Sequence, residues 1–339
     1  MNSSPSLLEV KDLQVHFRLR EGLVRAVDGA SFEVKQGQTL GVIGESGCGK
    51  SVTSLAILRI VPYPGKIVRG EILFHRSIDS GERGTEVMDL ANMDPGGDEI
   101  RRIRGGEISM VFQEPMSSLT PVYTVGSQIM EAILLHQRLS NSDARDKAIE
   151  ILDRVGMPKP SQTVDSYPHQ LSGGMRQRAM IAIALSCRPS LLIADEPTTA
   201  LDVTTEAQIL ELMKGLQQEL GMSIMYITHN LGVIAEMADQ VVVMYLGRIV
   251  ERADVRSLFH DPLHPYTRAL LGSIPRIGRK SRERLVSIKG IVPDAYSLPH
   301  GCLFHPRCAE CREGVCDRRE PELIEVQKGH WVSCLHCAS

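Results

Sequence analysis

An eight-residue stretch rich in glycine constrains the fold of this chain more than any other part of its sequence. It reads GESGCGKS, begins at Gly44, and matches the pattern G-x-x-x-x-G-K-[ST]. The short apolar run Thr39–Ile43 before it predicts a buried strand, and the run Val52–Leu58 after it predicts a helix. A strand, a glycine loop and a helix in this order form a cradle for phosphate groups, because backbone N–H groups and the helix N-terminus face one anion.

The side chains of this loop match the needs of a bound nucleotide. Lys50 is expected to reach the β- and γ-phosphates, and the Ser51 hydroxyl is expected to hold Mg²⁺. An aromatic residue earlier in the chain, Phe17, either stacks on the base of the nucleotide or packs inward as an ordinary strand residue. The predicted nucleotide-binding residues of the loop are Gly44, Glu45, Ser46, Gly47, Cys48, Gly49, Lys50 and Ser51.

Composition limits the classes of protein to which the chain can belong. Its 339 residues are enough for about two domains, and 42% hydrophobic with 23% charged residues is ordinary for a globular protein. The formal net charge of −3 gives no support for a nucleic-acid-binding protein. Since the sequence has no run of about 18 apolar residues and its N-terminus lacks the pattern of a secretion signal, we expect a cytoplasmic protein.

The arrangement of apolar runs predicts two kinds of sheet. Alternating residues in Leu7–Arg18 and Ala26–Val34 predict an antiparallel sheet ahead of the glycine loop. Later in the chain, short apolar runs alternate with helical patterns, which is typical of a mostly parallel α/β sheet. The expected strands are Ile108–Phe112, Leu191–Ala194, Ser223–Ile227, and a hairpin of Val241–Met244 with Arg248–Val250. The expected helices are Val125–Leu135, Asp143–Val155, Gln177–Leu185, Ala207–Leu220 and Leu231–Met237.

Two regions depart from this regular pattern. The segment His75–Gly106, which follows a short predicted strand at Gly70–Phe74, is polar and rich in glycine, so it predicts a surface insertion without assigned chemistry. After Glu251 prolines accumulate, the regular alternation stops, and most of the cysteines follow. We therefore predict one domain of residues 1–255 and a separate appended module of residues 256–339.

Polar residues follow the predicted ends of three buried strands, namely Gln113, the pair Asp195 and Glu196, and His229. In an open α/β sheet, ligands bind beyond the carboxyl ends of the strands, so these side chains are expected to converge on the nucleotide. Asp195 is placed to bind Mg²⁺ through its water shell, and Glu196 to polarise the attacking water. Gln113 is placed to contact that water and the Mg²⁺, and His229 to reach the γ-phosphate. Each residue alone can be a helix cap, but with a phosphate loop they predict phosphoryl transfer.

A second glycine element, LSGGMRQ, begins at Leu171. It opens a predicted helix, so Ser172 and the backbone N–H groups of Gly173 and Gly174 form a second anion site. The alternative is an ordinary glycine-rich helix cap. One chain therefore carries two candidate anion sites and one evident hydrolytic centre.

The order and spacing of these motifs resemble those of ATP-binding-cassette (ABC) ATPases. The resemblance covers roughly Leu7–Arg252 and rests on GESGCGKS, the Gln113 loop, LSGGMRQ, LLIADE, TALD and His229. The combination of LSGGMRQ with a phosphate loop is specific, because other families with such a loop lack it. It implies an α/β P-loop NTPase fold with a RecA-like core, an antiparallel β-subdomain, a helical signature subdomain and a cysteine- and proline-rich C-terminal extension.

The resemblance also implies how the site is assembled. ABC ATPases form head-to-tail dimers in which ATP lies between the phosphate loop of one subunit and Ser172–Gly174 of the other. Glu196 is then the general base, and Asp202 lies at the dimer interface. The implied catalytic residues are Glu196, His229 and Gln113; Mg²⁺ is held by Ser51, Gln113 and Asp195; and Phe17, Ser172, Gly173 and Gly174 join the loop in binding ATP.

Further segments narrow the resemblance to the importers of peptides and nickel. Gln113–Pro121 and Tyr167–Gln170 are similar to segments of that branch. In the tail, HPYT at His264 followed by GCLFHPRC resembles the C-terminal module of oligopeptide and dipeptide importer ATPases. Thr120 stands where the branch usually has Asn, and the long insertion at His75–Gly106 is also atypical.

The cysteines of the tail are expected to hold a metal rather than disulfides, because a reducing cytoplasm disfavours disulfides. By resemblance to relatives, Cys302, Cys308, Cys316 and Cys334 match the ligands of an iron–sulfur site, and their irregular spacing suits a [4Fe–4S] cluster. Cys311 lies between two of them as a competitor. The C-x-x-C segment Cys334–Cys337 makes a tetrahedral zinc site an alternative, and free thiols are the third interpretation.

The residues and the resemblance together predict the ATP-hydrolysing subunit of an importer of di- or oligopeptides, or of a related solute such as a nickel complex. ATP and Mg²⁺ are its expected cofactors. The implied partners are two membrane permeases, contacted by the segment from Gln113 to about Leu135, a second ATPase or a second copy of this chain, and an extracytoplasmic substrate-binding protein. The subunit would lie peripherally at the cytoplasmic face of the cell membrane. The alternative is a soluble ABC ATPase that acts on ribosomes or DNA, which usually carries two cassettes, a coiled coil or strongly basic elements.

Overall fold

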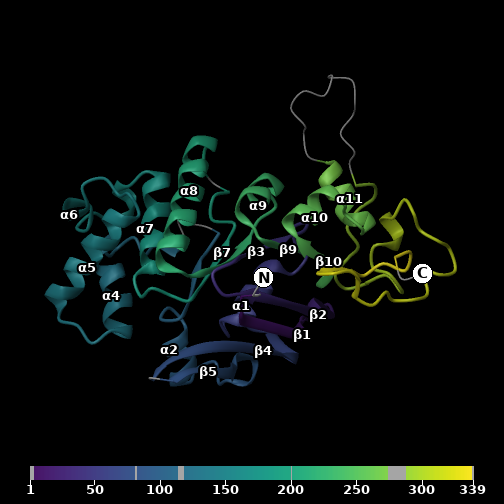
Figure 1. Ribbon diagram of the computed structural model, residues 1–339, viewed down its shortest axis with the longest axis horizontal. Coiled ribbons are helices and arrows are strands. Elements are labelled where there is room, and N and C mark those ends of the chain that lie inside the picture. Colours follow the sequence, from purple (N-terminus) through teal and green to yellow (C-terminus); the bar gives the residue numbers. More distant parts are fainter. Residues whose placement is uncertain (1–3, 81, 114–117, 200, 274–287, 338–339) are drawn as a thin grey trace. The chain divides into compact units, whose positions relative to one another are not determined.

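The computed structural model describes residues 4–80, 82–113, 118–199, 201–273 and 288–337. Two compact units are described separately below, and Figure 1 labels their elements. The loop unit, named for the glycine loop, comprises Leu8–Glu33, Leu40–Ala91 and the described part of Thr228–Ser339. The signature unit, named for LSGGMRQ, comprises the described parts of Met1–Leu7, Val34–Thr39 and Asn92–Ile227.

Four long strands form an antiparallel sheet in the loop unit. Their order across the sheet is β2-β1-β4-β5, and the apolar residues Leu8, Val10 and Leu13 of β1 are buried. The antiparallel sheet predicted ahead of the glycine loop is therefore confirmed. The strands are β1 (Ser6–Arg18), β2 (Leu23–Lys35), β4 (Gly65–Ser80) and β5 (Glu82–Asp89).

The region predicted to be an irregular insertion, His75–Gly106, is instead largely regular. Strand β4 extends well beyond the short strand predicted there and pairs with β5 in antiparallel register. The short helices η1 (Leu90–Asn92) and α2 (Asp98–Ile103) follow. The prediction was wrong because β5 lacks an apolar face: Val87 is 53% exposed, although its neighbour Met88 is buried. A strand held mainly by pairing shows little hydrophobic alternation in its sequence.

A second sheet of the loop unit carries the glycine loop. Strand β3 (Thr39–Ile43) is buried at every position and pairs in parallel with β9 (Gln240–Tyr245). Strands β10, β12 and β11 then follow in antiparallel pairing, so the tail is more regular than its sequence predicts. The other elements are α1 (Lys50–Ile57), α9 (Leu231–Met237), β10 (Arg248–Asp254), α10 (Val255–His260), α11 (Pro265–Gly272), η3 (His305–Arg307), β11 (Ile324–Gln327) and β12 (His330–Val332).

Three parallel strands and a group of helices form the signature unit. Strand β7 (Leu191–Asp195) pairs with both β6 (Ile108–Val111) and β8 (Ser223–Ile227), and β7 and β8 are buried throughout. Helix α4 packs against α5 and α7. The helices are α4 (Val125–His136), α5 (Asn141–Arg154), α6 (Pro160–Thr163), η2 (Pro168–Gln170), α7 (Gly173–Leu185) and α8 (Val203–Leu220). Within the described ranges, no helix is both long enough and apolar enough to cross a bilayer.

Candidate nucleotide site

The glycine loop connects β3 to α1 in the loop unit, as the sequence predicts. Gly44 has a φ of +154° and Gly49 a φ of +101°, values that favour glycine. A Cβ atom on Gly44 would lie 2.3 Å from the carbonyl oxygen of Met244, and one on Gly49 would lie 2.3 Å from that of Ala26. Neighbouring backbone therefore approaches the loop so closely that a side chain at either position would displace it.

Lys50 begins helix α1, and its ammonium group folds back over the loop. Its Nζ donates hydrogen bonds to the carbonyl oxygens of Gly44 at 2.8 Å and Glu45 at 3.1 Å. It also lies 3.8 Å from the Cys48 sulfur. Lys50 is buried, and a buried cation held by neutral oxygens would be strongly stabilised by an anion. This arrangement suits the phosphates of a nucleotide.

Glu45, inside the loop, is bound by two residues from beyond β10. Arg307 donates from Nη1 to Oε2 of the Glu45 carboxylate at 2.6 Å and from Nη2 to Oε1 at 3.0 Å. The backbone N–H of Glu45 donates to the Tyr266 hydroxyl at 2.9 Å. The Glu45 carboxylate raises the pKa of Arg307 above its already high usual value. The loop is therefore held from outside by the C-terminal part of the chain.

In the signature unit, Glu196 follows β7 directly, and two side chains hold its carboxylate. Its Oε2 accepts hydrogen bonds from Gln113 Nε2 at 3.0 Å and from Thr199 Oγ1 at 3.1 Å. The φ of Glu196 is +46°, and its N–H donates to the carbonyl of Ile227 at 2.8 Å. A strained backbone is typical of functional positions. Asp195 beside it is buried at the end of β7, and the structure brings Gln113 and Glu196 together as expected.

Ser172 and Asp202 each cap the start of a helix in the signature unit. The Ser172 hydroxyl accepts a backbone N–H at 3.3 Å at the start of α7, and the Asp202 carboxylate accepts that of Thr205 at 3.0 Å at the start of α8. Hydrogen bonds from Thr205 hold the pKa of Asp202 below its usual value. The two helix starts are adjacent, because a Cβ on Gly174 would lie 2.8 Å from the Thr205 methyl group. The helix-cap interpretation of Ser172 is confirmed, and its role toward an anion stays a prediction.

His229 and Phe17 belong to the loop unit. The N–H of Thr228 donates to the carbonyl of Val42 at 3.3 Å, so the exposed His229 next to it lies near the end of β3. Phe17 on β1 pairs with Gly65 on β4, and a Cβ on Gly65 would lie 2.5 Å from its ring. Phe17 thus covers the backbone of β4, which favours the packing interpretation, and stacking on the base stays a prediction.

Comparison with known proteins shows the family to which a chain with these features belongs. Residues 27–199 match the family described as ABC transporter, and residues 250–316 match the family described as oligopeptide/dipeptide transporter, C-terminal region. The chain belongs to the ABC transporter family. Its second match places it among the ATP-binding proteins of oligopeptide and dipeptide transporters, as the tail motifs predicted.

Relatives and solved structures agree with this membership. The chain is 47% identical to the dipeptide transport ATP-binding protein DppD of Escherichia coli (strain K12), over 97% of this chain and 96% of DppD. It is 48% identical to the oligopeptide transport ATP-binding protein AppD of Bacillus subtilis (strain 168), over 97% and 96% of the two chains. The ATP-binding cassette MJ0796, solved as a post-hydrolysis dimer with ADP and Pi, matches with a TM-score of 0.62 and 27% identity over 74% of this chain and 99% of that one. The predicted ABC ATPase fold is confirmed.

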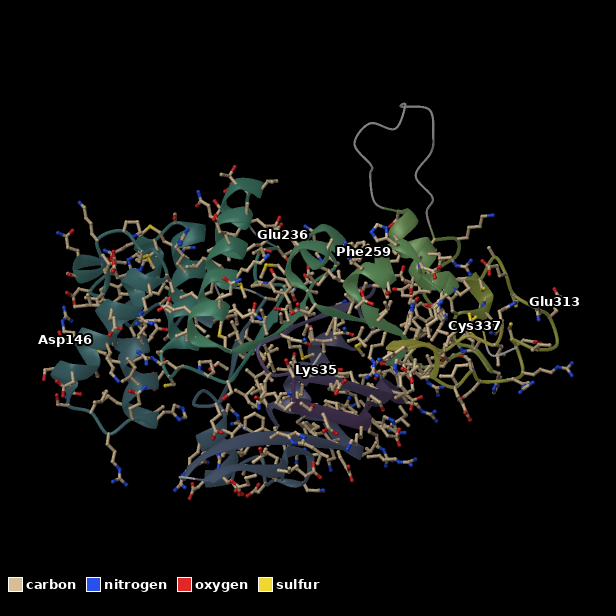
Figure 2. All side chains as sticks on the ribbon, viewed as in Figure 1. Lys35, Asp146, Glu236, Phe259, Glu313 and Cys337 are labelled. Atoms are coloured by element: carbon tan, nitrogen blue, oxygen red, sulfur yellow. The ribbon has the colours of Figure 1, made fainter. Side chains whose placement is uncertain are left out.

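The C-terminal extension, which is the appended module of residues 256–339, contains most of the cysteines, but its described part shows no metal site. Burial raises the pKa of the Cys302 thiol to about 11, and the neighbouring thiols of Cys334, Cys308 and Cys316 act in the same direction. Over the described ranges, however, no three side chains of Cys, His, Asp or Glu are arranged to hold a metal ion. All the cysteines, including Cys337 in Figure 2, are free thiols. The described residues therefore give no support for the expected [4Fe–4S] cluster or zinc ion, and either metal stays a prediction.

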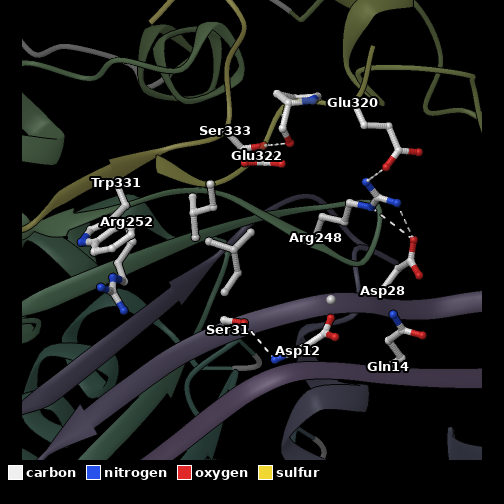
Figure 3. Close-up of a pocket in the computed structure, with 14 residues that line it drawn as sticks. Asp12, Gln14, Asp28, Ser31, Arg248, Arg252, Glu320, Glu322, Trp331 and Ser333 are labelled. Carbon is white, nitrogen blue, oxygen red and sulfur yellow. Dashed lines mark hydrogen bonds and ion pairs between the residues drawn. The ribbon is translucent and has the colours of Figure 1, made fainter. Parts of the chain in front are cut away.

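A pocket of about 640 Å³ lies in the loop unit where β1, β2, β10 and the extension meet (Figure 3). Arg248 joins its walls, because it binds Asp28 of β2 at 2.8 Å and Glu320 of the extension at 2.8 Å. Arg252 lies over Trp331, with its guanidinium carbon 5.0 Å from the ring centre. The described lining contains no residue expected to bind nucleotide. These contacts instead show how the extension is fastened to the core.

A buried carboxylate makes a second attachment between β10 and the extension. Glu251 accepts hydrogen bonds from the N–H groups of Leu263 at 2.7 Å and His264 at 2.9 Å, and it lies 2.7 Å from Nε2 of His330. Burial acts to raise the pKa of Glu251, but these hydrogen bonds outweigh it and lower the pKa overall. Burial lowers the pKa of His264 to about 4. Its neutral ring accepts the N–H of Tyr266 at 3.0 Å.

Two residues that contact the phosphate loop could not be predicted as site residues from the sequence. Arg307 and Tyr266 lie in the GCLFHPRC and HPYT segments, which the sequence identifies only as motifs of the appended module. The available signal is Glu45 itself, because a carboxylate in an anion-binding loop needs a compensating cation. Nothing local in the sequence identifies which arginine provides it.

Proposed function

We propose that this chain is the ATP-hydrolysing subunit of an ABC importer that takes up di- or oligopeptides. The observation that carries the proposal is the hydrogen bond between Gln113 and Glu196, because it fixes a carboxylate at a strand end where a general base is needed. The match of the C-terminal region to the oligopeptide/dipeptide family supports the class of solute. The names of DppD and AppD, a dipeptide and an oligopeptide transport protein, support it too.

In this proposal, the chain acts on the γ-phosphate by position and charge. Lys50 leaves the loop carbonyls and binds the β- and γ-phosphates, which the N-terminal N–H groups of α1 also face. Glu196 accepts a proton from the attacking water, and Gln113 orients both that water and the carboxylate. His229 binds the γ-phosphate, and Phe17 lies toward the adenine.

Mg²⁺, when bound, neutralises charge on the phosphate oxygens. Ser51, Asp195 and Gln113 would hold it, and these side chains offer the oxygen ligands that the ion prefers. The cysteines of the extension take no part in this mechanism. Iron and zinc analysis of anaerobically purified protein tests the predicted metal: stoichiometric iron would support the [4Fe–4S] cluster, and a colourless, metal-free protein would exclude it.

We infer that the subunit works as a head-to-tail dimer with a related ATPase or a second copy of itself. Ser172–Gly174 and Asp202 of each chain would face the nucleotide held by the other, which their position at adjacent helix starts supports. Two membrane permeases and an extracytoplasmic substrate-binding protein would complete the importer. The segment from Gln113 to Leu135 would contact the permeases, and the exposed Val122 and Tyr123 offer apolar surface there.

This contact would hold the subunit at the cytoplasmic face of the cell membrane. The division into an ATPase domain of residues 1–255 and an appended module of residues 256–339 is part of the same proposal. It is supported by the second family match, which begins at residue 250. The attachments through Arg248 and Glu251 imply that the module packs on the domain rather than hanging from a linker.

The test is ATP hydrolysis by the importer reconstituted in lipid vesicles. The chain is combined with its permeases and companion ATPase, and peptide-loaded binding protein is added. Peptide is expected to stimulate hydrolysis, and Glu196→Gln is expected to remove it. A chain that fails to bind permeases and instead purifies with ribosomes or DNA would support the alternative function.

A further inference from the structure

The Glu45 carboxylate is unexpected in a loop that binds a polyanion. A carboxylate near the triphosphate of ATP repels it unless a cation neutralises the charge. Arg307 supplies that cation through two hydrogen bonds, at 2.6 and 3.0 Å. The Arg307 side chain is only 4% exposed and that of Glu45 24%. The pair is therefore largely shielded from solvent and salt.

The backbone of Glu45 is held as well as its side chain. The peptide group between Gly44 and Glu45 donates its N–H to the Tyr266 hydroxyl at 2.9 Å, and its carbonyl oxygen accepts a hydrogen bond from Lys50 at 2.8 Å. Tyr266 is fully buried. When Lys50 turns to a phosphate, the Tyr266 hydroxyl still holds this peptide group.

Tyr266 packs in an aromatic cluster with Tyr245 and Phe304, and this cluster also holds Arg307 in place. The ring centre of Tyr245 lies 4.7 Å from that of Tyr266 and 5.3 Å from that of Phe304. Phe304 precedes the η3 turn that contains Arg307. The guanidinium of Arg307 lies 5.8 Å from the Tyr245 ring centre, and its Nε donates to the carbonyl of Lys289 at 3.2 Å. The contact with Glu45 is therefore part of a packed structure.

We propose that Arg307 and Tyr266 of the C-terminal module are positioning residues for the phosphate loop. Arg307 neutralises Glu45, and together with Tyr266 it holds the loop in the shape that receives ATP. The ATP affinity of the subunit thus depends on the C-terminal module, because Arg307 lies 262 residues after Glu45 in the chain. The inference rests on the proposed function, since it requires that the loop bind ATP.

The experiment measures binding of Mg²⁺–ATP to the full-length chain by titration calorimetry. Arg307→Met leaves an unpaired carboxylate in the loop, so the Kd for ATP is expected to rise about tenfold, or about 1.4 kcal/mol. Glu45→Gln removes the repelling charge. The double variant is therefore expected to recover most of the lost affinity, a rescue that a purely structural role of Arg307 does not predict.

Arg248→Met is the matched control. Arg248 also joins the core to the extension, but its ion pairs go to Asp28 and Glu320 rather than to the loop. Its variant is expected to unfold at a lower temperature and to bind ATP with the wild-type Kd. Tyr266→Phe removes one hydroxyl and is expected to raise the Kd about threefold. It tests the same loop should Arg307→Met not fold.

The outcomes separate this inference from the proposed function. A wild-type Kd in folded Arg307→Met, or a loss that Glu45→Gln does not relieve, overturns the role of Arg307, and a wild-type Kd in Tyr266→Phe overturns that of Tyr266. The proposed function fails instead if the wild-type chain does not bind ATP, or if Lys50→Ala binds it normally.

Discussion

The phosphate loop and the LSGG element both place glycines at the start of a helix, yet the structure holds them differently. In the loop unit, Gly44 and Lys50 are buried. Glu45, which follows Gly44, is held by Arg307 and Tyr266. In the signature unit, Ser172 is exposed, and its hydroxyl caps its own helix. One glycine element is held by other residues of its own chain, and the other is exposed at its helix start.

This difference indicates a division of labour. A loop whose shape is already fixed loses little conformational freedom when ATP binds, so binding can be a property of one chain. An exposed helix start offers its N–H groups to another molecule. We therefore expect ATP affinity to depend on the loop unit of a chain and hydrolysis to require the LSGG element of its partner.

The largest expected effect separates binding from hydrolysis. Glu196→Gln keeps an oxygen that can accept the Gln113 hydrogen bond but cannot take up a proton, so turnover is expected to fall about 1000-fold. The Kd for ATP is expected to stay near the wild-type value. Turnover is measured by phosphate release from the reconstituted importer. Thr199→Ala, which removes the Thr199 hydrogen bond to this carboxylate, is the milder control. Undiminished turnover in Glu196→Gln would remove Glu196 from the role of base.

The next largest effect tests the phosphate loop. Lys50→Ala removes the cation that faces the phosphates, so the Kd for ATP is expected to rise about 100-fold, which corresponds to about 3 kcal/mol. Calorimetric titration of the full-length chain measures it. Lys66→Ala, at an exposed position on β4, is expected to leave the Kd unchanged. Equal affinities in the two variants would contradict the phosphate-cradle assignment.

Acid should weaken the loop unit through His264. Burial lowers the pKa of His264 to about 4 in the folded chain, whereas about 6.5 is usual in an unfolded one. Stability is therefore full above about pH 6.5 and is lost as the pH falls toward 4, because only the unfolded state takes up the proton. Between pH 7 and pH 5 the free energy of unfolding is expected to fall by about 2 kcal/mol. Urea unfolding at a series of pH values measures this.

His264→Asn is the control for the acid effect. Asn keeps an oxygen that can accept the Tyr266 N–H but does not titrate, so the variant is expected to show a flatter pH profile. The charged groups near His264 are Glu251, which raises its pKa, and Arg268, which lowers it. The lowered pKa of Glu251 adds a loss only below about pH 4.5. An identical pH slope in the wild type and the variant would exclude His264 as the cause.

The smallest effect concerns the exposed side. Asp202→Ala removes the cap of α8 and is expected to lower the free energy of unfolding by about 1 kcal/mol, without changing the Kd for ATP of the isolated chain. Asp202→Asn keeps a capping oxygen and is expected to retain most of the stability. Thermal unfolding followed by circular dichroism compares them. A weakened ATP affinity in either variant would mean that this surface serves its own chain's nucleotide.

The parts of the fold that the sequence predicts well are those with a local signal. Strands β3, β7 and β8 are buried throughout, and their sequences are mainly apolar for that reason. The polar residues at the ends of β6, β7 and β8, namely Gln113, Glu196 and His229, could be identified from these apolar runs, and the Gln113–Glu196 contact agrees with that expectation. The hairpin of β4 and β5 was missed, because Val87 and other residues of β5 are exposed and show no apolar alternation.

The contacts of the extension could not be predicted from local pattern. Arg307 meets Glu45 across 262 positions of sequence, and His330 meets Glu251 across 79. Such contacts depend on how distant segments pack, and many arginines could have served as the partner of Glu45. The cysteines of the extension are a different case: their spacing resembles a metal site, but no group of side chains arranged to hold a metal ion is found among the described residues, so the metal stays a prediction.

The most direct test of the division of labour is Ser172→Arg, which blocks the LSGG element without touching the phosphate loop. Two quantities are measured: the Kd for ATP of the isolated chain, at a concentration where it is monomeric, and the ATP turnover of the assembled importer. We predict a wild-type Kd and a strongly reduced turnover. A weakened Kd in the isolated chain, or a normal turnover in the importer, would contradict the account.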